Sequence, residues 1–412
     1  MTDIFYYDIT NDLAVTWDDL IFDLKHVRNY SSLCYQSDYY GVFRQIVLSV
    51  LFDKNITLLD PGFTQQEISR LTGNIIPDEI DNIAEAFEIT NCKTKEDLLS
   101  LLKRNHQNWS ITLFTSGTTG LPKSVGHSFG AITRYVKCND KNKSDVWGFA
   151  YNPASMAGLQ VFFQALLNGN TIIRLYGVPQ NLLLKAVREA GITHISSTPS
   201  FYRLLLPNTE QFHKVRRITS GGEKFDTNTA EQLKAIFPNA KITNIYASTE
   251  AGTLLASEGN IFSIKPDLKG LIKIEDDELL VHKKLMGHTN IKIDEWYHTG
   301  DIVEILSGDP LKFQFVSRRN DLINVGGYKV NPYEVEEIIR EIEGVREVKV
   351  YGRKSSLLGN VVCCDIVRNN TILEEPDVRR YLDGKIQEYK IPRMITFVNE
   401  IITTRTGKIK RN

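Results

Sequence analysis

The chain has 412 residues, too many for one small hydrophobic core and enough for two or three domains of about 100–200 residues each. Hydrophobic residues make up 42% and charged residues 24%, a balance typical of globular proteins. The formal net charge of −1 gives no basic excess, so we expect no nucleic acid partner. No apolar run approaches the roughly 18 residues of a membrane helix, so we expect no membrane span.

The N-terminus has early acidic residues and no basic segment followed by an apolar one, so we expect no signal peptide. The five cysteines form no C-x-x-C motif, and Cys363-Cys364 lies in an apolar, strand-like run. We interpret them as reduced, mostly core cysteines of a cytoplasmic protein. The eight histidines show no metal-ligand spacing, which argues against a structural zinc site.

Up to about residue 110 the pattern is mixed and predicts helices at 18–27, 40–52, 65–71, 80–87 and 95–104. Beyond that point helices and strands alternate. Predicted helices lie at 128–137, 159–167, 182–190, 199–206 and 227–236. Predicted strands lie at 146–151, 171–175, 192–196, 215–220 and 242–246. This alternation favours βαβ units and a largely parallel sheet.

After about residue 255 the rhythm changes. Short strands at 271–274, 278–282 and 303–305, separated by hairpin-like turns, predict a smaller antiparallel sheet. A polar linker, Arg318-Arg319-Asn320-Asp321, precedes a further unit with helices at 332–343 and 378–388 and strands at 345–351, 361–367 and 394–398. We expect a large domain over residues 1–318 and a small α+β domain over residues 319–412.

The first candidate site follows a predicted strand and reads Thr115-Ser116-Gly117-Thr118-Thr119-Gly120-Leu121-Pro122-Lys123. The glycines allow close backbone approach to an anion, and the hydroxyls and Lys123 supply donors and a cation. The loop is not the triphosphate P-loop, because Pro122 stands where that motif requires its second glycine. Taken alone, the stretch is equally well explained as a polar turn between a strand and a helix.

Three further stretches carry candidate chemistry. Tyr246-Ala247-Ser248-Thr249-Glu250 follows a predicted strand, where open α/β sheets bind ligands, and its glutamate suits Mg²⁺. Thr299-Gly300-Asp301 places a carboxylate after a glycine turn, where it can chelate two ribose hydroxyls. Gly407-Lys408 lies near the end of the chain, on a loop able to reach another domain. Each one alone is better explained as a surface turn or a solvated tail.

Together, in this order and spacing, the stretches resemble the adenylate-forming superfamily, which includes acyl-CoA and aryl-CoA ligases, luciferases and peptide-synthetase adenylation domains. The resemblance runs from about residue 110 to the end. It covers the loop at 115–123, the Ser220-Gly221-Gly222-Glu223 turn, and the stretches 244–250, 297–301, 318–336 and 404–408. It implies an α/β fold, with a large N-terminal domain of βαβ sheets plus a small antiparallel sheet, followed by a small mobile α+β C-terminal domain.

The resemblance also implies a two-step reaction. A carboxylate attacks the α-phosphorus of ATP to give an acyl-adenylate and pyrophosphate, and a thiol then displaces AMP. The implied cofactors are ATP, Mg²⁺ and CoA or a phosphopantetheine thiol. The implied partners are a small-molecule carboxylic acid and CoA, or possibly an acyl carrier protein. An acid–CoA ligase is the leading interpretation. Transfer to a carrier protein, or a non-catalytic relative that only binds nucleotide or acyl ligand, are the alternatives.

The resemblance assigns residue roles. Lys408, Thr249, Glu250 and Lys123 would be catalytic, and Glu250 would hold the metal. The nucleotide would contact Thr115, Ser116, Gly117, Thr118, Thr119, Gly120, Gly221, Gly222, Asn244, Tyr246, Asp301 and Arg318. The acyl pocket would include Ser155, Met156, Phe201 and Ala247. The small domain would rotate about Asn320, withdrawing Lys408 and bringing Gly326 and Gly327 to a thiol tunnel.

Several features depart from the family pattern. Ser155 stands where members often have the histidine of an aromatic-His pair, which puts the usual gating of the acyl site in doubt. Only about 110 residues precede the phosphate loop, so part of the N-terminal region is trimmed. Asn320 replaces the usual hinge Asp or Lys. The Gly-Gly loop is similar to that of the succinylbenzoate–CoA ligase branch, and the mostly apolar pocket residues favour an acyl or aryl acid.

Overall fold

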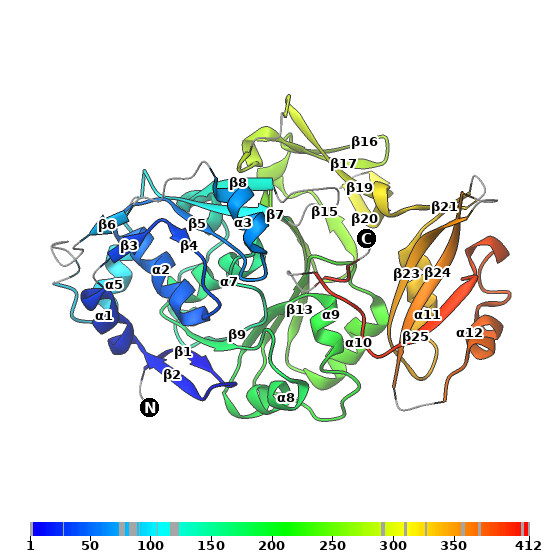
Figure 1. Ribbon diagram of the computed structural model, residues 1–412, viewed down its shortest axis with the longest axis horizontal. Coiled ribbons are helices and arrows are strands. Elements are labelled where there is room, and N and C mark those ends of the chain that lie inside the picture. The colour runs from blue at the N-terminus through cyan, green and yellow to red at the C-terminus, as the bar shows by residue number, and fades with distance from the viewer. Residues whose placement is uncertain are drawn as a thin grey trace.

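The computed structural model shows an elongated molecule whose N-terminal elements lie at the opposite end of the long axis from the C-terminal unit (Figure 1). Its described residues are 3–27, 29–73, 79–81, 89, 91–104, 106–115, 123–289, 293–308, 311–325, 328–355, 359–369, 372–404 and 408–410.

The largest sheet has eight strands in the order β14-β13-β12-β11-β9-β10-β1-β2. Its strands are β1 (Ile4–Asp8), β2 (Leu13–Thr16), β9 (Val146–Phe149), β10 (Thr171–Arg174), β11 (His194–Ser197), β12 (Arg217–Gly221), β13 (Lys241–Ser248) and β14 (Gly252–Ser257). From β13 to β1 every neighbouring pair is parallel, and the edge strands β14 and β2 are antiparallel. The predicted, largely parallel sheet is therefore confirmed, but β1 and β2 are not among the predicted strands.

Helices cover this sheet and a second one. They are α1 (Trp17–His26), α2 (Tyr39–Leu51), α3 (Gln65–Thr72), α5 (Lys95–Leu102), α6 (Phe129–Thr133), α7 (Met156–Leu166), α8 (Gln180–Glu189), α9 (Pro199–Arg203) and α10 (Thr227–Ile236). Capping boxes begin α1, α3 and α5, where Thr16, Thr64 and Thr94 each accept from the backbone of an acidic residue three positions on. None of the helices in the described part of the chain is long and apolar enough to cross a bilayer.

The second sheet has the order β18-β8-β7-β5-β4. It contains β4 (Leu33–Cys34), β5 (Ile56–Leu58), β7 (Ser110–Thr115), β8 (Lys123–Ser128) and β18 (His288–Thr289), while β3 (Asn29–Ser31) pairs separately with β6 (Glu79–Asp81). Two expectations are wrong here. The loop after residue 115 joins two antiparallel strands instead of a strand and a helix. The helix predicted from residue 80 begins inside β6, because Ile80 pairs with Tyr30, and its remainder lies outside the described residues.

A third, antiparallel sheet has the order β15-β20-β19-β17-β16. Its strands are β15 (Ile261–Ser263), β16 (Ile272–Glu275), β17 (Glu278–His282), β19 (Trp296–Gly308) and β20 (Leu311–Arg318). This confirms the predicted smaller sheet, although β19 is far longer than the expected strand at 303–305. As a result, Thr299, Gly300 and Asp301 lie within a strand and are fixed by its pairing to β17 and β20.

The C-terminal unit has its own sheet and core. It comprises β21 (Ile323–Val325), β22 (Tyr328–Val330), α11 (Pro332–Arg340), β23 (Val345–Ser355), β24 (Gly359–Arg368), α12 (Glu375–Leu382) and β25 (Met394–Val398). Val348, Cys364 and Val378 are fully buried in its core. The helix expected at 378–388 is misplaced: a capping box and Pro376 begin it at Glu375, and it ends before Gly384, which has a φ of +72°.

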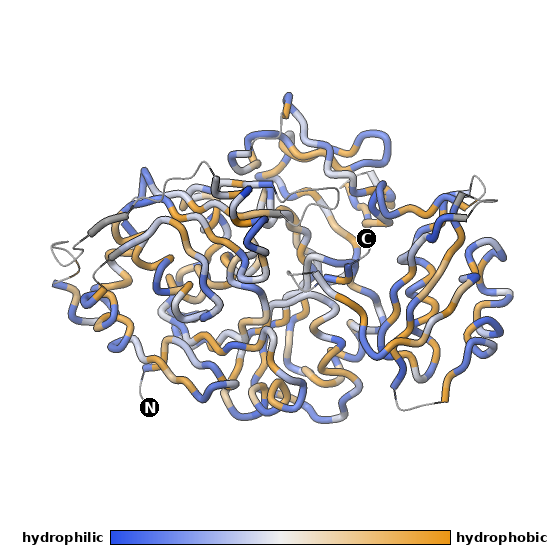
Figure 2. Tube along the Cα trace, in the orientation of Figure 1, coloured by the Kyte–Doolittle hydropathy of each residue, from blue (hydrophilic) through white to orange (hydrophobic). Residues whose placement is uncertain are grey.

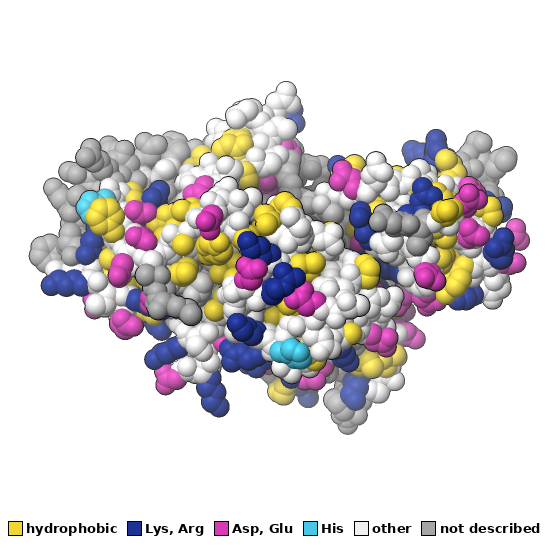
Figure 3. Space-filling view, turned by 90° about the horizontal axis from the view of Figure 1, so that it is seen from below, with side chains coloured by type: hydrophobic (Ala, Val, Ile, Leu, Met, Phe, Trp, Pro, Cys, Tyr) yellow, Lys and Arg dark blue, Asp and Glu magenta, His cyan; other side chains and the backbone are white. Residues whose placement is uncertain are grey.

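Hydropathy and charge follow this layout. Hydrophobic segments run along the interior strands and helices, and hydrophilic segments follow the outer turns (Figure 2). On the face shown in Figure 3, basic and acidic side chains are intermixed, in keeping with the net charge. All five cysteines are unpaired and only Cys138 is exposed, as expected for reduced core cysteines.

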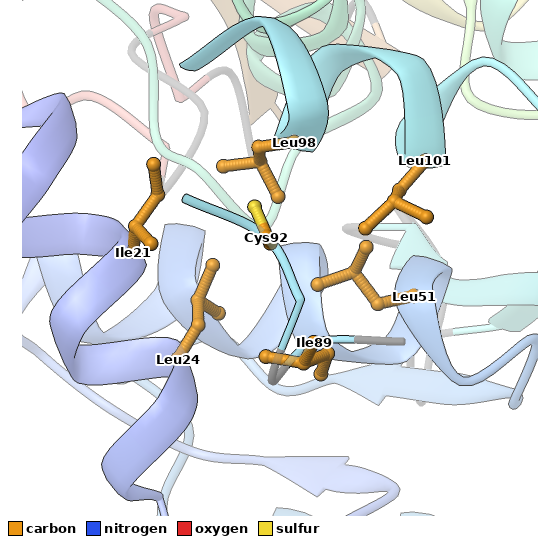
Figure 4. A pocket seen from close by; sticks show the side chains of 7 residues that line it. All are labelled: Ile21, Leu24, Leu51, Ile89, Cys92, Leu98 and Leu101. Carbon is orange, nitrogen blue, oxygen red and sulfur yellow. The ribbon is translucent and has the colours of Figure 1, made fainter. Parts of the chain in front are cut away.

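A small apolar crevice lies in the N-terminal region (Figure 4). It is lined by Ile21, Leu24, Leu51, Ile89, Cys92, Leu98 and Leu101. Burial raises the pKa of the Cys92 thiol, which therefore stays protonated and unreactive. The crevice is a small gap where α1, α2 and α5 pack together, and none of the candidate site residues lines it.

Candidate active site

The Thr-Glu pair lies in the tight turn between β13 and β14, directly after Ser248 ends the strand. Nε2 of His127 is 2.8 Å from the carbonyl oxygen of Thr249, and the amide of Gly287 donates to the carbonyl of Glu250 across 2.6 Å. Because a carbonyl only accepts, Nε2 must carry the proton. Burial lowers the pKa of His127, so the ring stays neutral. The turn that presents Glu250 is thus fixed from β8 and from the segment before β18.

The stem of the predicted phosphate loop adjoins this turn. Thr115 ends β7 and pairs directly with Lys123, the first residue of β8. The same strand β8 carries His127, so the loop stem and the Thr249-Glu250 turn are connected. Ser116, Gly117, Thr118, Thr119 and Gly120 lie outside the described residues.

Asp301 is the centre of a second cluster. Its Oδ1 accepts from Nε of Arg318 at 2.8 Å, and its Oδ2 accepts from the hydroxyl of Tyr246 at 2.6 Å. The ring of Tyr246 stacks on Phe315 with centroids 4.3 Å apart. Burial and the Asp301 carboxylate raise the pKa of Tyr246, so its hydroxyl remains a donor. The structure brings Tyr246, Asp301 and Arg318 together, and their contacts with a nucleotide stay a prediction.

Glu278 on β17 binds the backbone of β19 next to Asp301 and was not among the candidates. Its Oε1 accepts from the amide of Gly300 at 2.8 Å, and its Oε2 accepts from Arg319 at 3.0 Å. Gly300 has a φ of +73°, which favours glycine. The signal in the sequence was a carboxylate directly before the apolar run Leu279-Leu280-Val281. Glu278 is only 5% exposed, and a carboxylate can be buried to this extent because Gly300 and Arg319 donate hydrogen bonds to it.

Lys408 reaches this cluster from the C-terminal segment, which crosses from the C-terminal unit toward α9 and β13 (Figure 1). A Cβ atom on Gly222 would lie 2.8 Å from Cε of Lys408, so the end of the lysine side chain packs closely against the backbone of Gly222. Burial, and to a smaller extent the Arg318 guanidinium, lower the pKa of Lys408. The carboxylates of Glu223, Asp301 and Glu250 act in the opposite direction and raise this pKa, but the net shift is downward. Four separate stretches of the chain therefore meet around one amine.

The Gly-Gly turn and Asn244 line the end of the large sheet. Gly221 ends β12, and a Cβ there would lie 3.0 Å from the carbonyl oxygen of Ile245. The side-chain Nδ2 of Asn244 donates to the carbonyl of Gly259 at 3.2 Å and to Oδ1 of Asn260 at 3.1 Å. That nitrogen faces the β14–β15 turn, so a contact between Asn244 and an adenine edge stays a prediction.

The proposed acyl-pocket residues occupy two different packing environments. Ser155 caps α7: its Oγ accepts from the amide of Gly158 at 3.1 Å and donates to the carbonyl of Asn152 at 2.7 Å. Met156 and Phe201 are buried in separate hydrophobic clusters, and Ala247 is half-buried on β13. A single pocket that all four line stays a prediction.

The remaining predicted residues concern the C-terminal unit. Asn320 lies in a single 3₁₀ turn, Arg319–Asp321, between β20 and β21. Gly326 and Gly327 lie outside the described residues.

Comparison with known proteins now decides the family. The family model of the AMP-binding enzyme matches residues 64–293, more than half of the chain, and that of the AMP-binding enzyme C-terminal domain matches residues 334–408. The chain belongs to the AMP-binding enzyme family. The predicted adenylate-forming superfamily is thereby confirmed.

Individual relatives agree with this assignment. The chain is 27% identical over 399 residues to 2-succinylbenzoate–CoA ligase of Listeria monocytogenes, covering 86% of this chain and 82% of the relative. It is 26% identical over 409 residues to D-alanine–D-alanyl carrier protein ligase of Staphylococcus aureus, with the same coverage. The solved o-succinylbenzoate CoA synthetase of Bacillus subtilis, in complex with its acyl-adenylate intermediate, aligns over 99% of this chain and 94% of its own, with a TM-score of 0.68 and 18% identity.

These findings confirm the predicted fold class and the predicted enzyme class of AMP-forming ligases. His127 and Glu278 were missed, and Glu223 was noted only as the last residue of the Gly-Gly turn, without a role. Each acts through contacts between distant segments, which no local motif reveals.

Proposed function

We propose that the protein activates a carboxylic acid with ATP and transfers the acyl group to the thiol of CoA. The observation that carries the proposal is the position of Lys408. This residue comes from the C-terminal segment and lies against Gly222, within the field of Glu250, Asp301 and Arg318. A lysine ammonium beside these charged side chains can neutralise phosphate charge, so it suits the transfer of the adenylyl group of ATP to a carboxylate.

In the first step the substrate carboxylate attacks the α-phosphorus of ATP, and the bond to pyrophosphate breaks. All reacting groups are anionic, so catalysis consists mainly of positioning and charge neutralisation. The ammonium of Lys408 would offset the charge that the carboxylate and the α-phosphate share, with Thr249 donating to the phosphate. Lys123 at the mouth of the β7–β8 hairpin would hold the departing pyrophosphate. Asp301, fixed by Arg318, would accept from the ribose hydroxyls, while Tyr246 would pack against the adenine.

Mg²⁺ fits the residues present. It usually binds through one or two carboxylates together with substrate phosphates, and Glu250 sits on a rigid turn at the cluster. Among the described residues no group of three or more His, Cys, Asp or Glu forms a metal cage, so phosphate oxygens would complete the coordination. When bound, the ion supplies further neutralisation of phosphate charge.

In the second step a thiol attacks the acyl carbonyl and AMP leaves. We propose that residues 319–412 rotate about Asn320 as a small domain against residues 1–318, withdrawing Lys408 and bringing Gly326 and Gly327 to the site. The short turn at Arg319–Asp321, between two strands, is consistent with such a hinge.

CoA is favoured over a carrier protein as the acceptor. Lys329 on β22 and Arg353 and Lys354 on β23 are exposed on the C-terminal sheet, with β21 and β24 between them, and they are the candidates for contact with the 3′-phosphate of CoA. A relative is named as a carrier protein ligase, so the carrier remains the second candidate. Comparing thioester formation with CoA and with dephospho-CoA separates the two, because only CoA has the 3′-phosphate. A cytoplasmic location, with an acyl or aryl acid as substrate, stays part of the proposal.

The deciding experiment is ATP–pyrophosphate exchange across a panel of carboxylic acids. We expect exchange with at least one acyl or aryl acid. Measurable ATP binding without exchange for any acid would overturn the enzyme proposal in favour of a nucleotide-binding relative.

A further inference from the structure

Glu223 follows the Gly-Gly turn and joins two distant segments. Its Oε1 accepts from the amide of Ile409, the residue after Lys408, at 2.7 Å. Its Oε2 accepts from the amide and from the hydroxyl of Ser200 on α9, at 3.1 and 2.7 Å. One half-buried carboxylate therefore ties the backbone beside Lys408 to the wall of the large domain.

A carboxylate suits this place for a simple reason. Both backbone partners are N–H donors, and an ionised glutamate only accepts. Hydrogen bonds to an ionised acceptor are also about twice as strong as neutral ones. A glutamine would turn its NH₂ group toward the amide of Ile409 or of Ser200, so one of those two contacts would be lost.

Residues 402–404 pair with residues 408–410, and these two short stretches are called the Lys408 hairpin here. Thr403 and Ile409 form an antiparallel bridge, and the amide of Lys408 donates to Oγ1 of Thr404 at 3.2 Å. Anchoring the Ile409 amide therefore fixes the peptide from which the Lys408 side chain extends toward Gly222.

Ser200 shares its hydroxyl with a second contact to the C-terminal unit. Nη2 of Arg203 donates to Oγ of Ser200 at 3.0 Å, and Nε of Arg203 donates to Glu347 on β23 at 2.6 Å. The two polar connections, through Ile409 and through Glu347, thus converge on the first turn of α9.

We propose that Glu223 is a positioning residue that docks the Lys408 hairpin onto the large domain and thereby favours adenylation over thioester formation. This inference rests on the proposed function, in which Lys408 acts in the first step only. Glu223 acts through the Ile409 amide, and its carboxylate is already occupied on both oxygens by protein donors.

The test compares Glu223→Gln and Glu223→Ala with the unaltered protein in both half-reactions. We expect kcat for ATP–pyrophosphate exchange to fall about tenfold or more, with KM for ATP unchanged, because a charge-assisted hydrogen bond to the docked hairpin is lost. Thioester formation from supplied acyl-adenylate should be unchanged or faster. Glu231→Gln, at an exposed position on α10, is the matched control and should change neither step.

Ser200→Ala gives an internal check. It removes one of the three donors to Glu223, so we expect a smaller loss of exchange than in Glu223→Ala. The double variant should lose little more than Glu223→Ala alone, because the two residues act as one unit. Full additivity, or equal loss of both half-reactions in Glu223→Ala, would overturn the proposal.

A readout without catalysis separates this inference from the proposed function. Trypsin cleaves after lysine and arginine, so Arg405, Lys410 and Arg411 offer further cleavage sites, and only cleavage of the Lys408–Ile409 bond reports the contact with Glu223. We expect that bond to be cleaved faster in Glu223→Ala than in the unaltered protein, as followed by mass spectrometry of the fragments that end at Lys408. Equal cleavage rates would overturn the docking role even if exchange were found, whereas faster cleavage without exchange for any acid would overturn only the proposed function.

Discussion

Arg203 on α9 donates from Nε to Oε2 of Glu347 on β23 across 2.6 Å, joining the large sheet domain to the C-terminal unit. Arg203 is 9% exposed, and its Nη1 lies 3.3 Å from Asp226. Removing one partner of a buried ion pair leaves an uncompensated charge, whereas separating the two units returns both charges to water. We therefore expect the Arg203–Glu347 pair to contribute more to the contact between the two units than to the folding stability of either unit.

We expect Glu347→Gln to weaken docking of the C-terminal unit. The cost should fall below the roughly 3–5 kcal/mol of a wholly unpaired buried charge, because Asp226 remains beside Arg203. Exchange should fall, while thioester formation from supplied acyl-adenylate should persist. Glu343→Gln, at an exposed position between α11 and β23, serves as the control. Unchanged exchange in Glu347→Gln would show that the pair does not govern docking.

Lys408→Ala should abolish adenylation and spare the second step. Removing one preorganised charge from a transition state costs about 10²–10³ in kcat, and here the lysine would be the charge nearest the reacting atoms. Exchange and thioester formation from supplied acyl-adenylate are measured separately. Equal loss of both steps would contradict the rotating C-terminal domain.

The lowered pKa of Lys408 predicts the direction of a pH effect. Burial and Arg318 disfavour the ammonium, so it is lost at a lower pH than in a free lysine. Raising the pH through that lowered pKa stabilises the docked form, since a neutral amine is cheaper to bury, but it removes the charge that adenylation needs. We expect kcat/KM for ATP, which reports the free enzyme, to decline on the alkaline side. Lys408→Arg should lack this decline, even if its overall rate is low.

Asp301→Asn tests the nucleotide contacts. Asparagine has nearly the same shape as aspartate, but it lacks the negative charge to which Arg318 and Tyr246 donate hydrogen bonds. We expect KM for ATP to rise about tenfold or more, because hydrogen bonds to a charged acceptor are lost. Tyr246→Phe removes one donor and leaves the ring stacked on Phe315, so its effect should be smaller. A larger effect of Tyr246→Phe would place the main nucleotide contact on the tyrosine hydroxyl.

Local patterns predicted those parts of the fold that are fixed locally. The helix at Thr227–Ile236 and the strand at Glu278–His282 were predicted to the residue, because the Asp226 cap marks the start of the helix and the turn at Asp276-Asp277 marks the start of the strand. The strand Ile4–Asp8 was missed, because its burial depends on pairing with Thr171–Arg174, far along the chain. Ser155 could be aligned to a family position, but its role as the cap of α7 depends on Asn152 and Gly158.

The candidate site divides in the same way. Lys408, Asp301 and Glu250 stand in recognisable motifs and could be named from their order in the chain. Glu278 has no motif of its own, and Glu223 stood in the Gly-Gly turn without a role; the part that each carboxylate plays is identified only by the donors that the fold brings to it.

The last prediction concerns His127, which holds the turn that presents Glu250. His127→Leu leaves the Thr249 carbonyl without this donor, at a cost of about 1–3 kcal/mol, whereas the amide of His127→Gln can still donate. We expect the leucine variant to need more Mg²⁺ for half-maximal exchange and the glutamine variant to stay close to the unaltered protein.

His127 also predicts a loss of stability in acid. Burial and Arg134 lower its pKa, while Thr249 and Glu250 oppose them, so the unfolded chain takes up a proton at a higher pH than the folded one. The stabilisation is present above the ordinary histidine pKa and is lost as the pH falls through the lowered one. Between about pH 7 and about pH 5, the midpoint of urea unfolding should drop more in the unaltered protein than in His127→Gln. Parallel drops in the two proteins would mean that another group controls the acid response.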